Sequence, residues 1–327
     1  MFRSTKTIGI LALVAYAVII LLPPIVHGYI YPCMGDDSAL HLNIIKNGDL
    51  WNQLYYAYAV VGYPIRWLSG ITGISINELF LGFSYISLVG VGWSFYFVLS
   101  RLVNREAGYL SLVLPSFVSL GLWWQLDDGM TFNIISIGVI LPWLTYFMVR
   151  WLTQRKFYQL IVLFVLGMLY SFFHSTGIYL APTLGVLLLG YLIHKRTLVD
   201  KKVVMVLVGL IGLNLLGTYS LYAHTQDILP QAISKSFGGK LFPLFYYIQG
   251  ISVAVLVVGG YSLFILRKVK SVSVEIRLLL WGLGVLISLL LIASLGVSCS
   301  PDRQIFDMVT LVSLSACICV GVVFSIP

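Results

Sequence analysis

The chain has 327 residues, of which 59% are hydrophobic and only 10% charged, and its formal net charge is +8. Soluble domains are about half apolar and about a quarter charged. This composition therefore excludes a cytosolic enzyme, a disordered chain and a disulfide-rich secreted domain. The positive charge does not indicate nucleic-acid binding, because that requires a soluble basic face. We expect an all-α, polytopic membrane protein that contacts membrane lipids and no nucleic acid.

About ten apolar runs approach the roughly 20 residues that a transmembrane helix needs. They cover residues 8–26, 79–100, 107–126, 131–150, 157–173, 176–193, 203–222, 245–266, 278–297 and 305–324. We interpret the first run as a retained anchor, because Pro23 and Pro24 stand where a signal peptide would have its small-residue cleavage site. The fifth and sixth runs are expected to form a hairpin that turns near residues 174–177.

The distribution of charge predicts how the chain is oriented. With a cytoplasmic N-terminus, 15 of the 20 Lys and Arg residues fall in inner segments, as the positive-inside rule requires. Nine of the 12 Asp and Glu residues fall in outer segments, which the rule does not require. We expect a single transmembrane domain over residues 1–327 in the plasma membrane, with both termini cytoplasmic and no separate soluble domain. Its long outer loops are expected at about residues 27–78 and 223–244.

The first outer loop is expected to hold two interfacial helices. After Gly35 the apolar spacing becomes helical, which predicts that Leu40, Ile44 and Ile45 share one side of the first helix. The second is expected around residues 61–68, which are aromatic and too short to span. The aromatic residues of this part of the loop fit a belt at headgroup level, or alternatively a platform on which a sugar stacks. They are Tyr55, Tyr56, Tyr58, Tyr63 and Trp67.

Asp36, Asp37 and His41 are the candidates for chemistry in this loop. Asp37 and His41 are four residues apart, so they lie on the same face of the predicted helix. A carboxylate beside an imidazole can accept a proton from a hydroxyl nucleophile. The alternative is structural, since Asp37 or Ser38 would also serve as the N-cap of the helix.

Three further outer segments hold polar candidates. Asp127 and Asp128 could take a divalent cation if lipid phosphates or Asp36 completed the site, or they could form a solvated turn before Gly129. Arg303 suits a phosphate, although an arginine at a helix end also snorkels to the headgroups. His174 lies at the expected hairpin tip, where it would contact substrate or serve as an ordinary interfacial residue.

The order of these elements resembles the GT-C class of membrane glycosyltransferases. A first span is followed by a large outer loop that opens with the acidic pair Asp36–Asp37 and His41, and then by a Tyr-Pro helix at Tyr63–Pro64. A late outer Pro-acid-Arg element at residues 301–303 precedes the last span. Family members are often longer, with extra spans or a soluble C-terminal domain, and this chain departs from them in that respect.

The resemblance implies sugar transfer at the outer face from a polyprenyl-phosphate donor to a glycan, lipid or protein acceptor. Asp37 or Asp36 would be the catalytic base, and His41 would support that base or the donor phosphate. Asp127 and Asp128 would contact acceptor hydroxyls, and many relatives need no metal, so no cofactor is firmly implied. The remaining residues expected to bind the substrate or the donor phosphate are Arg303, Tyr63, Arg66 and His174.

Other functions stay open on the sequence. A transporter or flippase of a lipid or sugar would need polar groups near the middle of the spans, where the sequence offers Asn133, Asn214 and Gln249 as isolated residues. A non-catalytic subunit of an envelope glycan assembly, or a polymerase or ligase of lipid-linked glycans, would also fit the layout.

Overall fold

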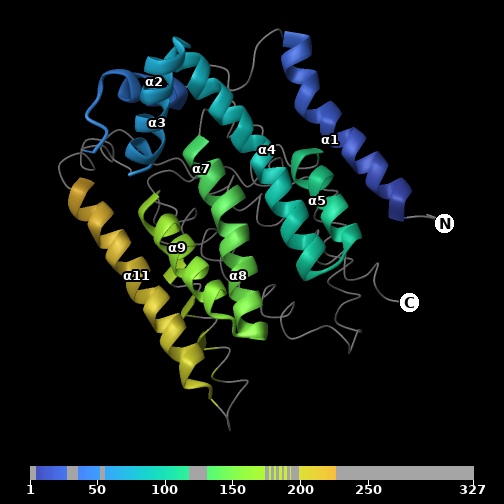
Figure 1. Cartoon of the computed structure of the whole chain (residues 1–327), viewed down its shortest axis with the longest axis vertical. Helices are drawn as coiled ribbons and strands as arrows, with labels where there is room; N and C mark the ends of the chain where they lie inside the picture. The colour runs from blue at the N-terminus through green and yellow to red at the C-terminus, as the bar shows by residue number, and fades with distance from the viewer. Residues whose placement is uncertain are drawn as a thin grey trace, which may run out of the picture.

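A computed structural model describes residues 5–27, 36–51, 56–117, 131–173, 177, 180–181, 184–185, 188–189, 192 and 199–225. This part of the chain is all-α and forms eight helices (Figure 1), which confirms the predicted class. Segments α7, η1 and α8 run on as one helix, Thr131–Gln154. The segments are α1 (Thr5–His27), α2 (Asp36–Asn47), α3 (Ala57–Thr72), α4 (Ile76–Leu102), α5 (Arg105–Phe117), α7 (Thr131–Ile135), η1 (Ser136–Ile140), α8 (Leu141–Gln154), α9 (Phe157–Phe173) and α11 (Lys201–Thr225).

Three of the described helices are long and apolar enough to cross a membrane. They are Ile76–Leu102, Thr131–Gln154 and Lys201–Leu221, and each coincides with a span predicted from the sequence. Two shorter apolar stretches, Gly9–Val18 and Phe157–Phe173, lie in other predicted spans. The predicted spans at residues 245–266, 278–297 and 305–324 lie outside the described residues, as does the end of the run at 107–126.

Basic residues gather where the described helices turn at one end of the bundle. Arg155, in the turn between α8 and α9, forms an ion pair of 3.1 Å with Asp200 at the start of α11. The opposite end carries α2 and α3 (Figure 1). The orientation relative to a membrane stays a prediction from the sequence. The residues at the basic end are Arg101, Arg105, Arg150, Arg155, Lys156, Lys201 and Lys202, against Glu106 and Asp200.

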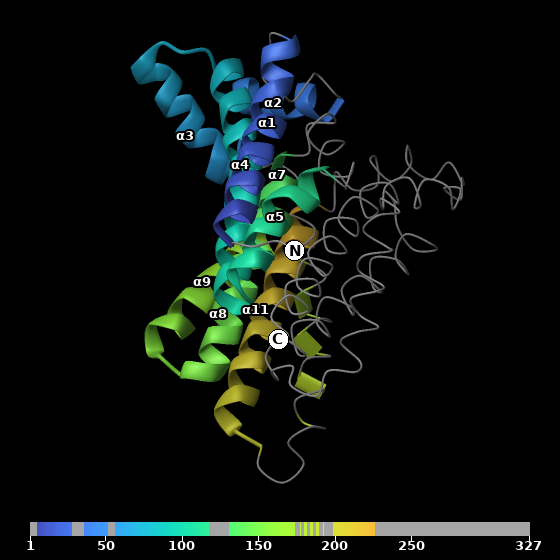
Figure 2. The ribbon, with the colours of Figure 1, turned by 90° about the vertical axis from the view of Figure 1, so that its right-hand side faces the viewer.

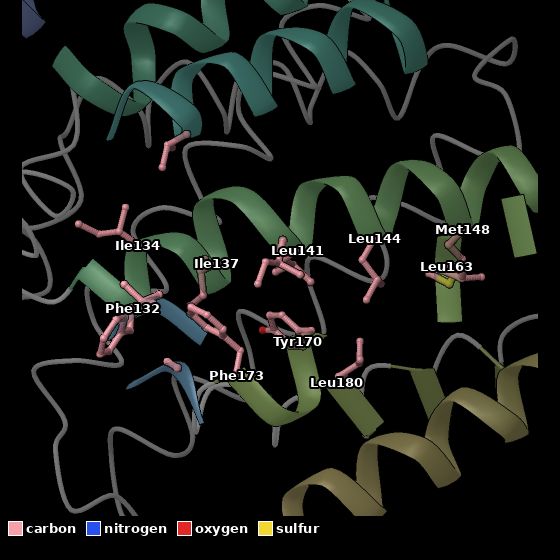
Figure 3. Packing of buried hydrophobic residues seen from close by; sticks show 14 of the residues in the cluster. Phe132, Ile134, Ile137, Leu141, Leu144, Met148, Leu163, Tyr170, Phe173 and Leu180 are labelled. Atoms are coloured by element: carbon pink, nitrogen blue, oxygen red, sulfur yellow. The ribbon is translucent and has the colours of Figure 1, made fainter. Parts of the chain in front are cut away.

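The main core lies between the Thr131–Gln154 helix and its neighbours. Apolar residues three or four positions apart, such as Ile137, Leu141 and Leu144, form one buried stripe on this helix. Tyr170 and Phe173 of α9 face that stripe (Figure 3). These apolar contacts hold α8 and α9 together as a helical hairpin.

A π-helical turn, η1, interrupts the helix at Ser136–Ile140. It packs against α4, where a Cβ added at Gly138 would lie 2.5 Å from Val91. A π turn takes an extra residue and so changes which side of a helix faces inward. On its N-terminal side the four consecutive residues 131–134 are all buried, and Phe132 among them contacts α2 and α3.

Asn214 of α11 is buried, and its side-chain amide makes three hydrogen bonds. Its Nδ2 donates to Ser171 Oγ and to the carbonyl of Gly177, both at 2.8 Å, and its Oδ1 accepts from the N–H of Ala181 at 2.8 Å. The side chain therefore joins α11 to the end of α9 and to the segment after it. Asn214 stands alone as a polar residue in its apolar span, and its partners come from neighbouring segments.

Replacing Asn214 by Leu is expected to lower the free energy of unfolding by about 2 kcal/mol, because hydrogen bonds between membrane helices are worth about 0.6 kcal/mol each and buried partners are left unsatisfied. Thermal unfolding of the purified protein in detergent measures the loss. The matched control is Asn77→Leu, since Asn77 is exposed in the first turn of α4. Equal stability of the two variants would show that the Asn214 contacts do not hold α11.

Candidate functional site

Helices α2 and α3 form a two-helix unit, here called the α2–α3 cap, over the N-terminal ends of α4 and α7. Both helices pack against α4, and Tyr56, just before α3, shares a hydrogen bond of 3.1 Å with Ser220 of α11. Figure 2 shows α3 leaning outward from the bundle. Two helices were predicted in this loop and both are present, with α2 beginning at Asp36 directly after Gly35.

The side of α2 that was predicted to carry Leu40, Ile44 and Ile45 is only partly buried. Leu40 is 51% exposed, while His41 and Ile45 are 6% and 0% exposed. The prediction followed the aliphatic residues, but α3 and α4 cover the side on which His41 lies. A histidine can take this position only if a partner satisfies its ring nitrogen.

Tyr58 of α3 is that partner. The Nδ1 atom of His41 and the hydroxyl of Tyr58 share a buried hydrogen bond of 2.6 Å. Around it, the His41 ring contacts Tyr58, Phe80 and Phe132 with centroid distances of 5.4, 6.2 and 4.8 Å. Helices α2, α3, α4 and α7 therefore meet at one histidine, which holds α2 in place.

Tyr58→Phe is expected to lower the stability of the protein by about 1 kcal/mol, because the buried His41 nitrogen loses its hydroxyl partner. Thermal unfolding measures the shift. Tyr63→Phe is the control, since Tyr63 lies on the other side of α3 and is 42% exposed. Finding no difference between the variants would contradict an anchoring role for Tyr58.

Arg66 of α3 is engaged with the end of α2. Its Nε donates to the carbonyl of Ile45 at 2.5 Å, and one terminal nitrogen donates to Gly48 at 2.7 Å and to Ile44 at 3.3 Å. The last carbonyls of a helix have no partner within the helix, and Arg66 provides one. We therefore assign Arg66 to the support of α2 rather than to a substrate phosphate.

The remaining predicted residues are dispersed. Asp36 and Asp37 form the first turn of α2, and Asp37 precedes His41 by one turn on the same helix. Tyr63 lies near Trp51, with ring centroids 6.2 Å apart, on the exposed side of α3. The other four, Asp127, Asp128, His174 and Arg303, lie outside the described residues.

The sequence interpretation missed Tyr58 and Phe132 as parts of the site. It assigned Tyr58 with the other aromatic residues to a belt or a sugar platform, although Ala57, Val61 and Ile65 share its buried face at helical spacing. That spacing was the available signal. Within the described ranges, no group of three His, Cys, Asp and Glu residues could hold a metal ion.

Neither a protein-family model nor any characterised protein sequence matches this chain. The resemblance to GT-C transferases therefore rests on the layout of its spans, loops and outer residues.

Proposed function

We propose that this protein is a membrane glycosyltransferase that uses a polyprenyl-phosphate sugar donor at the outer face. The observation that supports the proposal is that side chains of α3 anchor α2 at two points. The buried contact between His41 and Tyr58 fixes its middle, and Arg66 fixes its end. An acidic pair thereby begins a rigid helix at the end of the bundle opposite the basic residues. Catalytic groups work best on such supported elements.

The proposed reaction is a single displacement. Asp37, with Asp36 as the alternative, accepts the proton of an acceptor hydroxyl. The hydroxyl oxygen attacks the anomeric carbon, the bond from that carbon to the phosphate oxygen breaks, and the configuration inverts. Arg303 stabilises the departing lipid phosphate. Asp127, Asp128, His174 and Tyr63 remain candidates for binding the acceptor or the donor.

We further propose that α3 lies in the outer membrane interface of a protein with about ten spans. Its exposed side is apolar and aromatic, although its other side is already packed in the cap. A helix with such a surface settles at the boundary between headgroups and acyl chains. The exposed side consists of Val60, Tyr63, Trp67, Leu68 and Ile71.

An environment-sensitive dye tests the placement of α3. In a chain without its four native cysteines, Ile71→Cys carries the dye on the exposed side of α3, and Asn43→Cys carries it on the exposed side of α2. We expect blue-shifted emission and quenching by brominated lipid at position 71 but not at position 43. Equal, water-like emission at both positions would contradict an interfacial α3.

The function is tested by supplying purified protein with radiolabelled polyprenyl-phosphate monosaccharides and a mixture of extracted envelope glycans and lipids. Release of polyprenyl phosphate with a labelled acceptor product is the expected result. Movement of intact donor or free sugar across vesicles, without a new product, would instead support a flippase or transporter. If the protein forms no labelled product and moves neither donor nor sugar, a non-catalytic subunit is favoured.

A further inference from the structure

Two arginines at the basic end of the bundle stack on aromatic rings that touch each other. Arg101 Cζ lies 5.3 Å from the centroid of Phe97 in α4, and Arg150 Cζ lies 5.4 Å from the centroid of Tyr146 in α8. The centroids of these two rings are 5.7 Å apart. In both helices the arginine follows the aromatic residue by four positions, which is about one turn. Both arginines therefore lie closer to the C-terminal ends of α4 and α8 than Phe97 and Tyr146 do.

Neither guanidinium is neutralised by a described carboxylate. The ion pair that the structure records in this part of the chain joins Arg155 to Asp200, and it involves neither Arg101 nor Arg150. Arg150 Nε is buried without a hydrogen-bond acceptor among the described residues. Stacking on a ring holds the plane of a guanidinium group in a fixed orientation.

An aromatic surface continues from the two arginines toward the middle of the helices. Trp143 stacks on Phe97 with centroids 4.7 Å apart, and its Nε1 donates to Ser94 Oγ at 3.1 Å. Phe147 lies next to Trp143 and Tyr146. These rings are half-buried, so part of each faces outward between α4 and α8.

We propose that Arg101 and Arg150 bind the phosphate of an anionic membrane lipid in the cytoplasmic leaflet. The planar fork of arginine matches a phosphate, and the rings of Phe97, Trp143 and Phe147 line the path that the acyl chain would take. Charge favours this ligand, because seven basic residues stand against two acidic ones at this end of the described helices. The site lies at the opposite end from the α2–α3 cap and does not depend on the proposed transferase.

Native mass spectrometry of the whole protein tests the site. The probes are phosphatidylglycerol and phosphatidylcholine with identical acyl chains. We expect wild type to retain phosphatidylglycerol preferentially, and Arg101→Gln/Arg150→Gln to lower its retention at least about fivefold, as expected for losing membrane-facing charges. Retention of phosphatidylcholine is expected to stay unchanged.

The matched control is Lys201→Gln/Lys202→Gln, which removes the same charge from exposed positions at the same end. It is expected to retain phosphatidylglycerol like wild type. An equal loss in both double variants would overturn the proposal, because it would indicate diffuse charge attraction. Displacement of the lipid by equimolar inorganic phosphate would also overturn it.

If Arg101→Gln/Arg150→Gln fails to fold, a second variant tests the site. Arg101→Lys/Arg150→Lys keeps the charge and removes the planar guanidinium groups. It is expected to lower retention at least about twofold, and unchanged retention would also overturn the site.

Discussion

Asp37→Asn is expected to lower the rate of sugar transfer at least about a hundredfold, because an amide cannot accept the proton of the attacking hydroxyl. The substitution keeps the size of the side chain, and an Asn at a helix start still favours the helix. Folding should therefore be preserved. Initial rates of product formation at saturating donor measure the effect, with thermal unfolding run alongside.

Asp49→Asn is the matched control for this substitution. Asp49 follows α2, is exposed, and accepts a hydrogen bond of 3.1 Å from the backbone N–H of Trp51, which an Asn oxygen can also accept. We expect activity close to that of wild type. If Asp36→Asn abolishes transfer and Asp37→Asn does not, the base is Asp36 and the account of the cap is otherwise unchanged.

Arg66→Leu is expected to lower the free energy of unfolding by about 3 kcal/mol, because the carbonyls of Ile44, Ile45 and Gly48 lose a charged donor. Transfer should fall as well, since α2 is then free to shift. Thermal unfolding and limited proteolysis of the cap measure the change. Arg66→Lys should restore part of the stability, because a single ammonium group reaches fewer of these carbonyls.

Lys46→Leu separates this effect from a general loss of positive charge. Lys46 is exposed in the last turn of α2, and we expect its replacement to leave stability nearly unchanged. If Arg66→Leu were as stable as Lys46→Leu, the hydrogen bonds from Arg66 to α2 would not support the cap.

The long apolar helices could be predicted from the sequence because length and hydropathy determine them. The predicted spans at residues 79–100, 131–150 and 203–222 lie within α4, the Thr131–Gln154 helix and α11. The run at residues 157–173 has the bounds of α9, which is a shorter apolar helix. A membrane helix satisfies its own backbone polar groups, so its existence depends little on its neighbours.

The cap was predicted less well, because its residues have roles that tertiary contacts decide. His41 is buried because Tyr58, 17 residues later, shares a hydrogen bond with it and Phe80 and Phe132 contact its ring. Leu40 is 51% exposed. The family resemblance had placed Arg66 among residues that bind the substrate or the donor phosphate, whereas in the structure it donates to carbonyls at the end of α2. Periodicity indicates which side of a helix is apolar, but it does not identify the helix that covers that side.

The most direct test of the account is sugar transfer in vesicles that display only one face of the protein outward. Labelled polyprenyl-phosphate donor and acceptor are added outside the vesicles. The orientation of the protein is determined on a separate sample, from whether an added protease cleaves the basic loops. We expect product only where the α2–α3 cap faces the added acceptor, and none with Asp36→Asn/Asp37→Asn. Transfer on the basic face, or transfer unaffected by replacing both acids, would contradict the proposed site.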